Sequence, residues 1–135
     1  MSNPKFPRGS EWRKWDLQVH TPYSALNNGF GDDFDSYAKV LLELAVAKGI
    51  AVIGVTDYFS IDGYAKLRAL ISNRPKLETL VGVDIAAKAQ RILFLPNIEF
   101  RTSVIIAQPG DKASRVNFHV VFSDELESIV IEEHF

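Results

Sequence analysis

The segment from Phe34 to Lys48 is the feature that most constrains the fold, because its apolar residues follow the spacing of one helix face. They recur at i, i+3, i+4, i+7 and i+8, and they are Tyr37, Val40, Leu41, Leu44 and Ala45. Asp33 or Asp35 can cap the start of this helix, and Gly49 stands where a helix would end. We therefore predict an amphipathic helix over residues 34–48.

Two strand-like segments flank this helix. Residues 14–20 form the first, which Thr21 and Pro22 terminate because proline has no N–H for a ladder. Residues 50–55 are apolar without alternation, which is typical of a parallel strand covered on both faces. A second helix follows, capped by Ser60 or Asp62, with expected buried residues Tyr64, Leu67, Leu70 and Ile71. This order predicts a right-handed parallel α/β fold, with polar functional groups at the carboxyl ends of the strands.

The rest of the chain contains shorter elements. Residues 75–90 fit either a helix that contains a glycine or a short strand before a turn. Extended segments are expected at 91–95, 102–107 and 116–122, a turn at 108–111, and helical spacing over the acidic tail 124–135. The expectation is about five strands with flanking helices.

Strand alternation places polar side chains together on one side of two strands. In the first strand, one side carries Trp15, Leu17 and Val19, and the other carries Asp16, Gln18 and His20. In the last strand, an apolar side is opposed by Asn117, His119 and Val121. Gln18, His20 and His119 are therefore expected to face a polar site.

Composition limits the class of protein. The 135 residues are 47% hydrophobic and 24% charged, which suits one globular domain; we assign residues 1–13 to an irregular leader and 14–135 to that domain. A net charge of -2 gives no general attraction to nucleic acid or membranes. Without cysteine, a metal site must use His, Asp and Glu. No signal peptide or membrane span is evident, and we expect a cytoplasmic protein.

Four side chains that can bind or support a metal lie near predicted strand ends: His20, Asp57, Glu99 and His119. Imidazole and carboxylate groups suit a divalent ion such as zinc, manganese or magnesium. Each residue also has an ordinary structural explanation, since Asp57 could cap a helix and Glu99 could pair with Arg101. Spacing alone leaves both interpretations open.

The segments DLQVHTPYS, GVTDYFSIDGY, LPNIEFR and NFHVVFS resemble successive motifs of the PHP (polymerase and histidinol phosphatase) domain. The run from Trp12 to Ser123 is most similar to the PHP-like amino-terminal region of TrlF-type proteins, which continue into an AAA-like or SMC-like ATPase. The resemblance implies a distorted (β/α) barrel whose rim metals activate water for attack on phosphorus.

Residue roles follow from this resemblance by matching motif positions. His20, Glu99 and His119 match metal ligands, so the implied cofactor is a divalent ion, zinc or manganese or else magnesium. Asp57 matches a residue that supports the site by hydrogen bonding, and Arg101 is a candidate contact for the substrate phosphate. The implied partners are a phosphoester substrate, nucleic acid among the possibilities, and an attached ATPase domain, with no membrane.

The chain also departs from the family pattern. Gln18 and Tyr58 stand where the family has histidines, and Asn97 stands where it has glycine, while Asp32 or Asp33 could supply an acidic loop ligand. A complete barrel needs ~200 residues or more, so we expect an amino-terminal part of a larger protein.

Three hypotheses remain at this point. The first is a metal-dependent phosphoesterase or nuclease-like module with an altered site, whose turnover in these 135 residues alone is weak or absent. The second is a degenerate, non-catalytic PHP fold with a structural or regulatory role. The third is an unrelated α/β module that binds an anion at a helix amino terminus.

Overall fold

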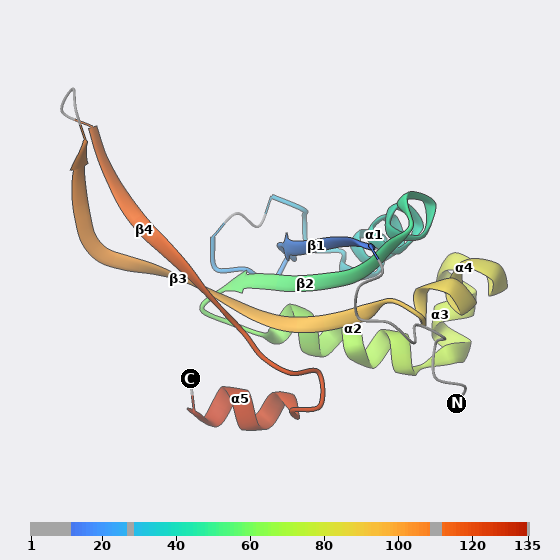
Figure 1. The fold of residues 1–135 in the computed structure, drawn as a ribbon. Helices are drawn as coiled ribbons and strands as arrows, with labels where there is room; N and C mark the ends of the chain where they lie inside the picture. The colour runs from blue at the N-terminus through green and yellow to red at the C-terminus, as the bar shows by residue number, and fades with distance from the viewer. Residues whose placement is uncertain (1–11, 27–28, 109–111, 135) are drawn as a thin grey trace.

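The computed structural model describes residues 12–26, 29–108 and 112–134 and shows a mixed α/β fold around one curled sheet (Figure 1). Residues 1–11 of the predicted leader and residues 109–111 of the predicted turn lie outside the described residues. The strands are β1 (Lys14–Val19), β2 (Ile50–Tyr58), β3 (Leu93–Gln108) and β4 (Lys112–Val121). The helices are α1 (Phe34–Lys48), α2 (Asp62–Ser72), α3 (Arg74–Val81), α4 (Val83–Ala89) and α5 (Ser128–His134).

The sheet order is β1-β2-β3-β4. The first three strands are parallel, as the alternation of strands and helices predicts, and β4 returns antiparallel to β3. The parallel arrangement brings the carboxyl ends of β1 and β2 to the same edge, beside the middle of β3. Beyond that edge, β3 and β4 continue as a two-stranded ribbon past the helices (Figure 1).

Helix α1 has the predicted bounds and caps, but its buried residues are Ala38, Leu42 and Ala45, whereas Val40 and Leu44 of the predicted face are exposed. The Asp33 carboxylate accepts the Ser36 N–H at 3.1 Å, and Gly49 ends the helix in the left-handed region at φ 67°. In α2, Tyr64, Leu67 and Leu70 are buried as expected. The uncertain region 75–90 is helical, and Gly82 divides it into α3 and α4 because its φ of 82° interrupts the helix.

Strand β3 corrects the prediction of two separate strands at 91–95 and 102–107, because it runs unbroken from Leu93 to Gln108. The described sheet therefore has four strands rather than about five. The Pro96 carbonyl accepts the Phe122 N–H at 2.9 Å, so the Pro96 nitrogen, on the same side of the strand, also faces β4. The residue pairs of the β3–β4 ladder end at Asn97 and Val121. The strand therefore tolerates a residue without an N–H at position 96.

Strand β1 does not keep the predicted alternation. Asp16 pairs with Ile53 but Val19 pairs with Val55, so a β-bulge inserts one residue between them. Val19 therefore packs against the core, while Trp15 and Leu17 remain 61% and 40% exposed. The prediction that all three share one face is wrong because a bulge reverses the side to which later residues point.

Buried polar side chains stabilise this bulge. The Leu17 carbonyl accepts hydrogen bonds from Thr56 Oγ1 at 2.9 Å and from Asn97 Nδ2 at 2.9 Å. Gly54 allows the strands to approach, since a Cβ there would lie 2.6 Å from the Leu17 oxygen. Asn97, a departure from the family pattern, thus links β1 to β3 across β2.

One face of the sheet carries the hydrophobic core. Ile53, Val55, Phe94 and Ile98 pack there with apolar residues of all five helices. Glu99 alternates with Ile98 along β3, so its side chain is on the opposite, inner face of the curl. Within the described ranges, no helix is long and apolar enough to cross a bilayer.

Candidate functional site

Glu99 lies at the centre of a polar cluster on the inner face of the sheet. Its side chain is 1% exposed. One carboxylate oxygen, Oε2, is 3.5 Å from His20 Nε2, and the other, Oε1, is 3.9 Å from His119 Nε2. His119 is directly opposite Glu99 in the antiparallel ladder, whereas His20 arrives from the end of β1. The structure thus brings together the three residues that the sequence nominates as metal ligands.

The hydrogen bonding of this carboxylate is incomplete. Oε1 accepts a bond of 2.7 Å from Asn117 Nδ2, but Oε2 is buried and has no hydrogen-bond partner among the described residues. A buried carboxylate oxygen without a donor is unfavourable unless positive charge faces it. A bound cation would supply that charge.

Three contacts fix the position of His20. Its ring stacks on Tyr58 with centroids 5.3 Å apart and planes 6° from parallel. Its carbonyl accepts a hydrogen bond of 2.6 Å from the Tyr37 hydroxyl. The next residue, Thr21, is held by Asp57. Since His20 Nδ1 has no hydrogen-bond partner in the described structure, the stacked Tyr58 orients this ring in place of a hydrogen bond.

Asp57 is not part of the Glu99 cluster. Its two oxygens accept hydrogen bonds of 2.7 Å from the N–H and the hydroxyl of Thr21. Burial raises the pKa of the Asp57 carboxyl, and the Thr21 hydrogen bonds and the charge of His20 oppose this rise. Asp57 therefore fixes Thr21, the residue that follows His20.

Arg101 lies beside the cluster and does not pair with Glu99. Its Nη2 donates to the Tyr58 hydroxyl at 3.3 Å, and its Nε donates to Asn117 Oδ1 at 3.2 Å. The Tyr58 hydroxyl also accepts from Asn117 Nδ2 at 3.0 Å. Burial, followed by hydrogen bonding to Glu99 and by the negative charge of Glu99, raises the pKa of Tyr58, and Arg101 opposes this rise.

Sequence reasoning missed the roles of Asn117 and Tyr58. Strand alternation places Asn117 on the same side as His119, and this placement is the sequence signal that identifies it. In the sequence, Tyr58 stands where the resembled family has a histidine, whereas in the structure it is 2% exposed and stacks on His20. An aromatic ring in a ligand position can therefore orient a neighbouring ligand.

Two other candidate residues do not join the cluster. Gln18 is an exposed residue of the β1 bulge, and its side chain makes no hydrogen bond within the described part of the chain. The Asp33 carboxylate is used by the Ser36 N–H and hydroxyl at the start of α1. The prediction that Gln18 points toward Glu99 thus receives no support from any contact.

The cluster does not form a closed metal site. Within residues 12–26, 29–108 and 112–134, no three His, Asp or Glu side chains are arranged to hold one ion as they stand. The His119 side chain is 33% exposed and Arg101 is exposed, so the cluster is open to solvent on the β4 side. A cation could enter there, and a small rotation of the exposed His119 ring would change its distance to Glu99.

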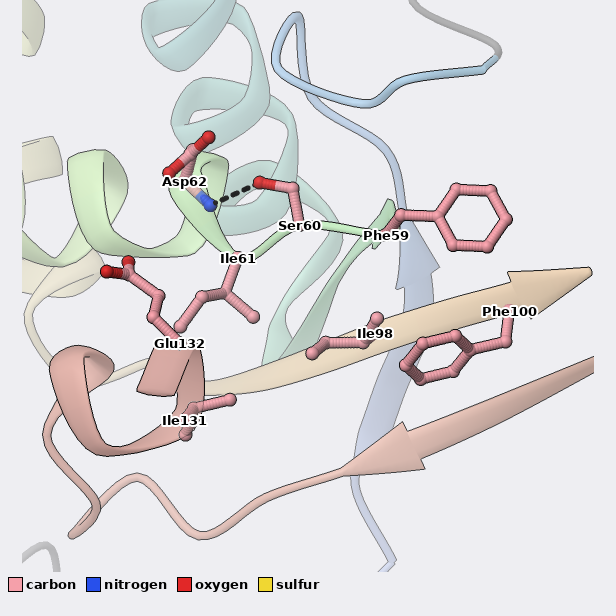
Figure 2. A pocket seen from close by; sticks show the side chains of 8 residues that line it. All are labelled: Phe59, Ser60, Ile61, Asp62, Ile98, Phe100, Ile131 and Glu132. Carbon is pink, nitrogen blue, oxygen red and sulfur yellow. Dashed lines mark hydrogen bonds between the residues drawn. The ribbon is translucent and has the colours of Figure 1, made fainter. Parts of the chain in front are cut away.

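A separate hollow of about 360 Å³ lies between β3, α5 and the start of α2 (Figure 2). Ile98 and Phe100 form part of its wall, and both alternate with Glu99 along β3. The hollow is therefore on the other face of the sheet from the polar cluster. Its walls combine apolar side chains with Ser60, Asp62 and Glu132, and Glu99 is not among the residues that line it.

The fold and the site together define a mixed α/β protein with a buried carboxylate between two imidazoles at the edge of a curled sheet. A scan against protein-family models and a search of curated proteins find no match for the chain.

Proposed function

We propose that this chain is a metal-dependent phosphoesterase module of the PHP type, nuclease-like and with an altered metal site. The observation that carries the proposal is the buried Glu99 Oε2, which has no hydrogen-bond partner in the described structure and is 3.5 Å from His20 Nε2. Two imidazoles and a carboxylate suit zinc or manganese better than magnesium, which prefers oxygen ligands. On this proposal the sheet is part of a distorted barrel in a larger, ATPase-linked protein.

The donor atoms of this cluster are of the types that bind a divalent cation, although they are not arranged to hold one ion as they stand. His20, Glu99 and His119 would hold it, and Tyr58 and Asp57 would keep His20 in position. When bound, a divalent ion supplies an activated water and neutralises charge on phosphoryl oxygens. The exposed guanidinium of Arg101 would bind a phosphate oxygen from the solvent side.

Metal analysis tests this proposal directly. The purified chain and a His20→Ala, His119→Ala double variant are incubated with Zn²⁺ or Mn²⁺, desalted and analysed for bound metal. The proposal predicts about one ion in the parent chain and much less in the double variant. Equal, negligible metal in both, with circular dichroism showing both folded, would contradict it.

Phosphodiester hydrolysis in Mn²⁺ gives a second measurement. With bis-p-nitrophenyl phosphate, we expect weak or no turnover by the parent chain and, where turnover is measurable, less by the double variant. Equal measurable turnover by the two chains would favour the second candidate function, described next.

The second candidate is a non-catalytic PHP-type fold that stabilises or regulates an attached domain. The 2.7 Å hydrogen bond from Asn117 to Glu99 favours it, because this bond occupies one carboxylate oxygen without a metal. Tyr58 in a ligand position favours it as well. In this case, loss of Glu99 would leave hydrolysis unchanged and alter only stability.

A further inference from the structure

We propose that Asn117 is a positioning residue that couples the Glu99 ligand site to the Arg101 phosphate site. This inference rests on the proposed function and deepens it. Asn117 is opposite Arg101 in the β3–β4 ladder, and His119, two residues further along β4, is opposite Glu99. Its position between the two groups allows one side chain to contact both.

The hydrogen bonds of Asn117 run in opposite directions. Its Nδ2 donates to Glu99 Oε1 at 2.7 Å and to the Tyr58 hydroxyl at 3.0 Å, while its Oδ1 accepts from Arg101 Nε at 3.2 Å. An ionised carboxylate only accepts and a guanidinium only donates. The amide group of Asn117 satisfies both partners at once. In the flipped orientation, its oxygen would face the Glu99 carboxylate and its NH₂ group would face the Arg101 guanidinium, so neither hydrogen bond could form.

This arrangement has a consequence for each partner. Because Asn117 holds Oε1 of Glu99, the unpartnered Oε2 is the oxygen that faces His20. Because Asn117 and Tyr58 occupy Nε and one Nη2 hydrogen of Arg101, the guanidinium is held with its Nη1 free of hydrogen bonds to the described residues. The Nη1 group can therefore bind a phosphate oxygen without a further loss of Arg101 side-chain entropy.

A double-mutant cycle tests the coupling. Inorganic phosphate binding is measured by calorimetry in Mn²⁺ for the parent chain, Asn117→Ala, Arg101→Ala and the double variant. If Asn117 acts through Arg101, Asn117→Ala weakens phosphate binding several-fold in the parent background and not at all in Arg101→Ala. Equal effects in both backgrounds would overturn the inference.

Metal affinity supplies the other half of the test. Removing a side chain that orients a ligand typically costs tenfold or more in metal affinity, so Asn117→Ala should weaken Mn²⁺ binding about tenfold. Ser114→Ala, on the same strand, is the matched control and should leave both affinities unchanged. Asn117→Gln keeps a donor and an acceptor, so it should retain part of the Mn²⁺ affinity and part of the phosphate affinity. Asn117→Ser is too short to reach both partners and should retain neither.

The outcomes separate the two proposals. A parent chain that binds neither Mn²⁺ nor phosphate overturns the proposed function and the coupling with it. A parent chain that binds both, with Asn117→Ala and Asn117→Ser equal to the parent, overturns the coupling alone. Circular dichroism of every variant excludes unfolding as the cause of a loss.

Discussion

Two buried carboxylates lie on neighbouring strands, Asp57 on β2 and Glu99 on β3, and they are 1% and 0% exposed. Both oxygens of Asp57 accept hydrogen bonds from Thr21. Glu99 accepts one from Asn117, and its Oε2 has no donor among the described residues. The strand alternation directs Glu99 to the inner face, whereas Asp57 faces α2, where Gly63 leaves space for it.

The comparison shows that burial alone does not identify a functional carboxylate. A carboxylate whose oxygens are all bonded stabilises the backbone it holds, as Asp57 does for Thr21. One with an unsatisfied oxygen beside two imidazoles is a candidate ligand for a cation. Substitutions at the two positions should therefore separate stability from binding.

The largest effect is expected from Asp57→Ala. It leaves the N–H and the hydroxyl of Thr21 buried without an acceptor, so the free energy of unfolding should fall by roughly 3 kcal/mol. Urea denaturation measures this. Thr21→Val removes one of the two bonds and should cost less. An unchanged urea midpoint for Asp57→Ala would show that Asp57 does not stabilise the turn.

Gly63→Ala should have the next largest effect. A Cβ at Gly63 would collide with Thr21 Oγ1 and Asp57 Oδ2, so the hydrogen-bonded pair must move. We expect a loss of about 2 kcal/mol in the free energy of unfolding. Gly29→Ala is the matched control, because a Cβ there meets nothing within 4 Å. Equal stability of the two variants would contradict the tight packing around Asp57.

Glu99→Gln should change stability by no more than about 1 kcal/mol, in contrast to Asp57→Ala. The amide oxygen can still accept from Asn117, and the unbalanced charge is removed. In excess Mn²⁺, however, the parent chain should gain thermal stability and the variant should not. Thermal unfolding with and without EDTA measures both effects. A variant that Mn²⁺ stabilises as much as the parent would refute Glu99 as a ligand.

The smallest expected effect is a pH slope at Asp57. Because its pKa is raised above the ordinary 3.8 in the folded state, the stabilising contribution of protonated Asp57 is complete below pH 3.8. It is lost as the pH rises through the folded-state pKa. Urea denaturation from pH 3 to 7 should therefore show the parent losing stability relative to Asp57→Asn. A relative gain with rising pH would mean that the Thr21 hydrogen bonds outweigh burial.

Local patterns were enough to predict much of the fold. Helix α1 has the predicted bounds because its spacing, its cap at Asp33 and its stop at Gly49 all lie within the segment. The β1 bulge and the continuity of β3 through Pro96 could not be predicted in this way. Both depend on which strand is the neighbour and on which side of it hydrogen bonds are needed.

The sequence nominated most residues of the candidate site but not the hydrogen bonds between them. Residue type and strand ends nominated His20, Asp57, Glu99 and His119, and Arg101 was added as a candidate phosphate contact. The hydrogen bonds of Glu99 and Arg101 with Asn117, and of Arg101 with Tyr58, required the register of β3 with β4. Asp57 and Glu99 also look alike in sequence, since each is an acid near a predicted strand end. Their hydrogen-bond partners, which are remote in sequence, distinguish them.

The sequence by itself determined helices α1 and α2, the parallel arrangement of the first strands and the residue types available for chemistry. These depend on periodicity and on caps, which act over a few residues. Only the tertiary structure decided that Glu99 has an unpartnered oxygen and that Asp57 has none. The reason is that hydrogen bonding inside a protein depends on groups brought together from distant segments, here the end of β1, β3 and β4.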